Sequence, residues 1–314
     1  MRGSGYGDLT PQRTAIETRN TQHGQSGNIQ KSTEDRDLKT RGLSHHIFSG
    51  EYHSVFKGRG MSFSEVREYQ YGDDIRNIDW NVTARFNHPY IKIFEEEREL
   101  TVMLLIDVSA SNTFGTQKQL KEELVTELAA VLSFSAIQNN DKVGVIFFSD
   151  KIEKFIPPKK GTSHILRIIR ELLDFKAESN GTNIAEALRY LTNAIKKRSI
   201  AFLISDFMDD GFEKAVQIAN HKHDLIAIRV TDKVETQLPD VGLVRLMDAE
   251  TGRMRWIDTS NKAVRRAFED WTVKKRQELD VLFNRLGVDM AKVYTGEDYV
   301  KPLMNLFRKR EARR

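Results

Sequence analysis

The sequence contains no cysteine, which excludes disulfides, thiolate metal sites and cysteine nucleophiles. No window approaches the roughly 18 to 20 continuous apolar residues that a membrane-spanning helix needs. The first thirty residues also lack the charged-then-apolar pattern of a secretory signal. We therefore expect a cytoplasmic protein without a transmembrane segment.

Several catalytic and nucleotide-binding motifs are also missing. There is no G-x-x-x-x-G-K-[ST] phosphate loop, no H-E-x-x-H metal motif and no G-x-S-x-G nucleophile elbow. His45, His46 and His53 lie near one another, but no carboxylate or cysteine set accompanies them, so zinc has little support. These absences leave nucleotide binding, zinc chemistry and serine hydrolysis without a sequence basis.

The formal net charge is only +4, and the C-terminal tail accounts for all of it. Residues 308–314, RKREARR, hold five basic residues and one acidic residue. Such a tail could bind nucleic acid, anionic lipid or an acidic protein patch. It could equally be a solvated helix end, where cations favour the helix dipole. We favour the second interpretation, so we expect no nucleic acid, while a peripheral membrane contact through the tail stays open.

The chain divides into segments of different composition. Residues 1–36 are polar and nearly free of aliphatic clusters, which predicts disorder, and Met1-Arg2-Gly3-Ser4 resembles an expression-vector leader. Residues 37–98 mix aromatic and charged residues, and short alternating runs there predict a small β-rich segment.

Residues 99–310 alternate between apolar strands and amphipathic helices. This pattern predicts an α/β fold: a doubly wound, mostly parallel sheet with helices on both faces. A hairpin is expected as an insertion near 240–260. The strands are predicted at 102–108, 141–150, 151–158 (an antiparallel edge), 199–207, 224–232 and 291–296. The helices are predicted at 117–140, 163–175, 183–198, 211–222, 262–286 and 297–311.

Small oxygen-bearing side chains follow the most hydrophobic strand. Asp107, Ser109 and Ser111 stand at alternate positions after that run. Asp206 closes a second apolar strand, and Thr182 precedes a helix in the segment SNGTN. Because ligands in open parallel sheets sit outside the carboxyl ends of the strands, we expect these five residues to converge at one sheet edge.

The predicted cluster offers only oxygen ligands, two carboxylates among neutral hydroxyls. Such a set suits Mg²⁺, or a similar divalent cation such as Mn²⁺, which keeps several waters and accepts few protein charges. An incomplete shell leaves room for a partner's Asp or Glu carboxylate, which is adhesion chemistry. Each element also has a purely structural explanation, because Ser, Asp, Thr and Asn commonly cap the next helix.

A second acidic segment precedes the sheet. In YQYGDDIRNIDWNVTAR, the acids Asp73, Asp74 and Asp79 could form another cation or catalytic site. Alternatively they pair with nearby arginines in a structural network that docks the segment, with Trp80 as apolar anchor. We favour the network. Its expected arginines are Arg67, Arg76 and Arg85.

The motif D-V-S-A-S, starting at Asp107, resembles the D-x-S-x-S of von Willebrand factor A domains. The metal-ion-dependent adhesion site of that family takes a threonine from a second loop and an aspartate from a third. Thr182 in GTN and Asp206 in ISD match those positions in order. The resemblance implies that a metal is held by Asp107, Ser109, Ser111, Thr182 and Asp206.

Residues 58–99 resemble the signature of the bacterial domain-of-unknown-function 58 family, which couples such a segment to an A-like domain. One departure is Ala110-Ser111-Asn112, where many relatives have Gly-Ser-Met. The resemblance implies a non-enzymatic adaptor, a metal-dependent protein-binding module working with a MoxR-type AAA+ ATPase or its client. The alternative is a metal-assisted phosphohydrolase that uses the same acids, although no evident general base accompanies them.

Overall fold

The computed structural model describes residues 14–16, 62–95, 99–109, 115–116, 119–179, 181–232, 235–248 and 254–313. The chain forms two compact units, one of residues 56–100 and one of the remaining residues. None of the helices described is long and apolar enough to cross a membrane.

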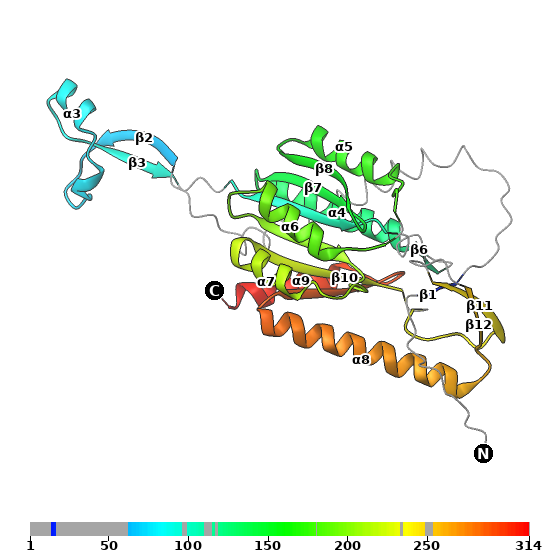
Figure 1. Cartoon of the computed structure of the whole chain (residues 1–314). Coiled ribbons are helices and arrows are strands. Elements are labelled where there is room, and N and C mark those ends of the chain that lie inside the picture. Colours follow the sequence, from blue (N-terminus) through cyan, green and yellow to red (C-terminus); the bar gives the residue numbers. More distant parts are fainter. Residues whose placement is uncertain are drawn as a thin grey trace, which may run out of the picture. The chain divides into compact units, whose positions relative to one another are not determined.

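The larger unit is built on a six-stranded sheet in the order β13-β10-β9-β4-β7-β8 (Figure 1). Five strands are parallel, and β8 pairs antiparallel with β7 at one edge. The α/β class and the antiparallel edge strand predicted from the sequence are confirmed. The strands are β4 Thr101–Asp107, β7 Lys142–Phe148, β8 Ile152–Lys159, β9 Ile200–Ser205, β10 Asp224–Thr231 and β13 Asp289–Tyr294.

Helices surround this sheet, as predicted. They are α4 Lys121–Gln138, α5 Thr162–Leu173, α6 Ile184–Ala194, α7 Glu213–Lys222, α8 Lys262–Leu286 and α9 Val300–Glu311. On one face, Met103 and Leu105 of β4 share a core with Leu188 of α6, Val216 of α7 and Phe283 of α8. Val102, Leu104 and Ile106, which alternate with them and point to the other face, are also fully buried, and this burial on both faces explains why β4 is apolar throughout.

Helix α4 differs from its prediction. Its apolar residues were expected on one face, but most of its side chains are buried, including Ala130, Ser133 and Lys121. Leu120, which the predicted helix 117–140 included, is exposed and precedes the helix. The helix is therefore enclosed on nearly all sides, which places its first residue, Lys121, inside the protein.

The predicted hairpin is present as β11 Leu243–Asp248 and β12 Met254–Asp258, and its predicted turn lies outside the described residues. Strand β1, Thr14–Ile16, pairs antiparallel with β11. The other residues of the segment 1–36, for which disorder was predicted, lie outside the described residues. A further short pair joins β5 Gly115–Thr116 to β6 Gln119–Leu120.

The smaller unit contains the antiparallel pair β2 Ser62–Glu68 and β3 Tyr90–Glu95. Between them lie a 3₁₀ turn, η1 Ile75–Asn77, and a short helix, α3 Trp80–Phe86. The helix was not predicted. Asp79 caps its start by accepting hydrogen bonds from the N–H groups of Asn81 and Val82, and Asn87 ends it in the left-handed conformation.

Candidate metal centre at the carboxyl edge of the sheet

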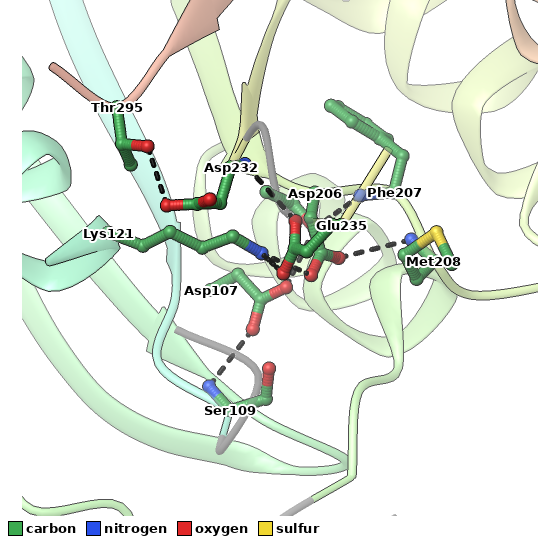
Figure 2. A network of polar contacts seen from close by, with 10 residues as sticks. Asp107, Ser109, Lys121, Asp206, Phe207, Met208, Asp232, Glu235 and Thr295 are labelled. Carbon is green, nitrogen blue, oxygen red and sulfur yellow. Dashed lines mark hydrogen bonds and ion pairs between the residues drawn. The ribbon is translucent and has the colours of Figure 1, made fainter. Parts of the chain in front are cut away.

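Asp107 is the last residue of β4 and is almost completely buried. Its Oδ1 accepts a hydrogen bond from the N–H of Ser109 at 3.0 Å, which folds the chain into a tight turn after the strand (Figure 2). Its Oδ2 accepts the hydroxyl of Ser205, at the end of the adjacent strand β9, at 2.7 Å. Asp107 and the buried Ser109 therefore occupy the strand end where the sequence predicts them.

Asp206 follows β9 and is also buried. Its Oδ1 accepts the N–H of Met208 at 3.1 Å. Phe207, the next residue, has a φ of 58°, a left-handed conformation that is strained for an aromatic residue. The ring of Phe207 packs edge-on against Phe283 of α8, with centroids 5.2 Å apart. This anchor holds the turn that directs Asp206 towards β4.

Thr182 comes from the loop before α6, and two hydrogen bonds fix that loop. The N–H of Asn183 donates to the carbonyl of Ser149, after β7, at 2.8 Å. The N–H of Ile184 donates to Asp209, after β9, at 2.8 Å. Because β4 lies between β7 and β9 in the sheet, this loop passes over the end of β4. Thr182 is thus brought to the edge that carries Asp107.

The loop passes very close to the end of β7 at Gly181. A Cβ at this position would lie 3.3 Å from the Cβ of Asp150, tighter than most real contacts. A residue with a side chain would push the loop away from the sheet, so glycine permits the close approach.

The side chain of Thr182 is buried at this edge, and its hydrogen bonding is incomplete in the described part of the chain. The residue is only 8% exposed. Its hydroxyl oxygen is buried and has no hydrogen-bond partner among the residues that the structure describes. A buried hydroxyl left without a partner costs free energy, so such a group in a native fold calls for an explanation. Ser111, the fifth predicted ligand, lies outside the described residues.

Lys121 was not predicted as part of the site. It is the first residue of α4 and is fully buried. Figure 2 shows the ammonium end of its side chain pointing at the two acids that it contacts. Its Nζ lies 3.3 Å from Oδ2 of Asp206 and 2.5 Å from Oε1 of Glu235. A lysine at the start of a helix is ordinarily solvated, so the sequence pattern alone carried no signal for this residue.

Glu235 is itself held by the turn after β10. The N–H of Asp232 donates to Oε2 of Glu235 at 3.2 Å, and the N–H of Glu235 donates to the carbonyl of Asp232. The hydroxyl of Thr295, after β13, donates to Asp232 at 2.6 Å. The polar network therefore extends along the carboxyl edge from β4 to β13 (Figure 2).

The acids at this edge are electrostatically crowded. Burial raises the pKa of Asp107 to about 6, and the neighbouring charge of Asp206 contributes to the increase. Burial and Asp206 likewise raise the pKa of Glu235, although Lys121 opposes them. Burial alone would lower the pKa of Lys121, but Glu235 and Asp206 raise it above its usual value, so the ammonium stays charged.

This arrangement fits a hard divalent cation. Asp107, Asp206 and Glu235 together carry three carboxylates against the single ammonium of Lys121, so the fully ionised cluster is negative. Thr182 and Ser109 add neutral oxygens, and no described residue hydrogen-bonds the hydroxyl of Thr182. In the described part of the chain, no three His, Cys, Asp or Glu side chains are arranged to hold a metal. Ligation here would therefore use hydroxyls and water besides the acids.

The acids of the smaller unit are satisfied within that unit. Arg67 donates two hydrogen bonds to Asp73, at 2.7 and 2.9 Å, and these lower the pKa of Asp73. Arg76 pairs with Asp74, with Nη2 and Oδ2 2.8 Å apart. Asp79 caps α3 and lies 3.5 Å from the Nζ of Lys92, a partner that was not predicted. These contacts support the predicted pairing of the acids with basic residues over a second cation site, whereas Trp80, expected as the apolar anchor, is 70% exposed.

Comparison with known proteins places the chain in a family. The sequence profile described as "Protein of unknown function DUF58" matches residues 65–278. The uncharacterized protein Rv1480 of Mycobacterium tuberculosis is 29% identical over 262 residues, 82% of each chain. The uncharacterized protein YeaD of Bacillus subtilis is 30% identical over 109 residues, 35% of this chain and 25% of YeaD.

A solved structure, the conserved hypothetical protein BatB of Bacteroides thetaiotaomicron, covers 68% of this chain and 100% of its own. Its sequence identity is 17% and its TM-score is 0.44, which is too low to carry an argument. The family profile, by contrast, matches more than half of the chain. The chain belongs to the DUF58 family of proteins of unknown function.

Proposed function

We propose that this chain is a metal-dependent protein-interaction module with a von Willebrand factor A-like domain. Mg²⁺, or another hard cation such as Mn²⁺, would bind at the carboxyl edge of the sheet, at an adhesion site of the D-x-S-x-S type. The partner would supply an Asp or Glu carboxylate to the metal. The observation that carries the proposal is the buried hydroxyl of Thr182, for which no described residue supplies a hydrogen-bond partner.

The residues of the proposed site have two different roles. Ser109 and Thr182 offer neutral oxygens, and Ser111 would add a third. Asp107 and Asp206 supply the negative charge, directly or through water. With so few charged ligands, a bound Mg²⁺ keeps enough Lewis acidity to accept a carboxylate from a partner. The turns at Ser109 and Phe207 orient the acids before any ligand arrives.

The identity of the partner is supported by the family resemblance alone. The resemblance favours a MoxR-type AAA+ ATPase or its client, in the cytoplasm. The site chemistry adds only that the partner presents an exposed carboxylate. A pull-down with a candidate ATPase, first with Mg²⁺ and then with EDTA, tests the identity of the partner. The proposal predicts that EDTA and Asp107→Ala each abolish capture of the ATPase. Capture that is unchanged in both would reject metal bridging.

Thr182→Val tests the site itself, because valine has nearly the shape of threonine and lacks the hydroxyl. Because the hydroxyl has no partner in the described part of the chain, the variant should unfold in EDTA at the wild-type temperature or slightly above it. The increase in unfolding temperature that Mg²⁺ gives the wild type should be largely lost. Thermal unfolding in EDTA and in millimolar Mg²⁺ measures both quantities.

Thr272→Val is the matched control. Thr272 is also 8% exposed, but its hydroxyl donates to the carbonyl of Phe268 within α8, far from the sheet edge in sequence. This variant should lose stability in EDTA and keep the full Mg²⁺ response. An equal Mg²⁺ response in wild type and Thr182→Val would contradict the proposal. Turnover of a phosphate ester that Asp206→Ala abolishes would favour the phosphohydrolase instead.

A further inference from the structure

The metal proposal leaves Lys121 unexplained, although it is the most unusual residue of the site. Lysine is rarely fully buried unless it is paired. Here the ammonium contacts Asp206, a candidate ligand, and Glu235, which is not one. The contact with Glu235 is the shorter, 2.5 against 3.3 Å. Two acids from different loops therefore share one cation.

The two acids differ in their surroundings. The side chain of Asp206 is 6% exposed and lies beside Asp107 at the strand ends. The side chain of Glu235 is 23% exposed and is fixed by the turn after β10. Glu235 thus holds the ammonium from the outer side, and Asp206 from the inner side. How strongly Lys121 neutralises Asp206 depends on how strongly Glu235 draws it away.

We propose that Lys121 is a positioning residue, a built-in counter-ion that neutralises and orients Asp206 when no metal is bound, with Glu235 setting its strength. This inference rests on the proposed function where it concerns the metal. A divalent cation beside Asp206 would do the same neutralising work as the ammonium, so the two positive charges oppose each other. The Lys121–Glu235 pair thereby adjusts the affinity of the site for the cation.

The proposal predicts opposite effects for two single variants. Lys121→Met keeps most of the length of the side chain and removes its charge, so Mg²⁺ should bind about tenfold more tightly. Glu235→Gln leaves Lys121 wholly to Asp206, so Mg²⁺ should bind about tenfold more weakly. If Lys121 and Glu235 only packed the site, the two variants would not change the Mg²⁺ affinity in opposite directions. Titration calorimetry with MgCl₂ on the full chain measures both changes.

Unfolding in EDTA tests the same pair without metal. Lys121→Met leaves Asp206 and Glu235 buried without their cation, so its unfolding temperature should fall strongly. Lys121→Met with Glu235→Gln removes one charge of each sign, so the double variant should recover a large part of that fall. Lys292→Met, which removes an ion pair between β13 and Asp280 of α8, is the control and should leave Mg²⁺ binding unchanged.

The outcomes separate this inference from the proposed function. Equal Mg²⁺ affinity in wild type and Glu235→Gln would overturn the role of the pair in metal binding. Additive losses of stability in EDTA, without recovery in the double variant, would overturn the counter-ion role. If neither wild type nor any variant binds Mg²⁺, the proposed function fails, while recovery in the double variant still supports the counter-ion role. If Lys121→Met does not fold, Glu235→Gln alone decides the sign of the effect.

Discussion

At the scale of single residues, the candidate site combines residues that the sequence predicts with one residue, Lys121, that it does not. Asp107 and Asp206 end apolar strands, and Thr182 precedes a helix, so parallel-sheet geometry predicts that they meet. Lys121 escapes such reasoning, because its burial depends on α4 being enclosed on nearly all sides. A buried charge is a tertiary property, and no local pattern records it.

Asp107 makes the site sensitive to pH. Its pKa is about 6 in the folded protein, against 3.8 for an ordinary aspartate. Between these values the folded state holds a proton that the unfolded state has lost. In EDTA, this group's contribution to stability is therefore present below about pH 4 and lost as pH rises towards 6. Unfolding of wild type and Asp107→Asn across this range measures the difference, and parallel pH profiles would contradict it.

Metal binding should show the opposite trend with pH. A cation must displace the proton from Asp107, so Mg²⁺ affinity should fall about tenfold for each pH unit below about 6. Calorimetric titrations at pH 5, 6 and 7.5 measure this dependence. An affinity that stays constant from pH 5 to 7.5 would show that Asp107 does not take part.

At the scale of elements, helix prediction worked where apolar periodicity was long and failed where it was short. Helix α8, Lys262–Leu286, starts and ends where predicted. Helix α3, Trp80–Phe86, has only seven residues, and its Asn, Val, Thr and Phe are weak helix formers. Its ends are set by Asp79 and Asn87, caps that an irregular segment could equally contain. Short helices of this kind depend on caps more than on pattern.

The packing of β7 gives a test of the sheet. A Cβ on Gly144 would lie 2.8 Å from the Sδ of Met103 in β4 and 2.9 Å from the backbone N of Pro158 in β8. Backbone cannot move aside as a flexible side chain can, so Gly144→Ala should lower the free energy of unfolding by about 1 to 3 kcal/mol. Urea unfolding measures the change, and a variant as stable as the wild type would mean that β7 and β8 pack less closely.

At the scale of the whole molecule, the order of strands and helices was predictable and the site was predictable in part. Apolar strands alternating with helices require a sheet covered on both faces, and this much follows from composition and period. The loop of Thr182 reaches the end of β4 through backbone hydrogen bonds to Ser149 and Asp209, which sequence order cannot reveal. Membership of the DUF58 family assigns no activity to the chain, because the function of that family is unknown.

The central claim is that the carboxyl edge of the sheet binds a divalent cation between Asp107, Ser109, Thr182 and Asp206. The most direct measurement is a crystal structure of the full chain grown with Mn²⁺, with diffraction data collected to locate manganese by anomalous scattering. The account predicts a manganese peak at this edge, about 2 to 2.3 Å from the hydroxyl oxygen of Ser109. A well-ordered edge with Lys121 on Asp206 and no manganese peak at saturating Mn²⁺ would contradict it.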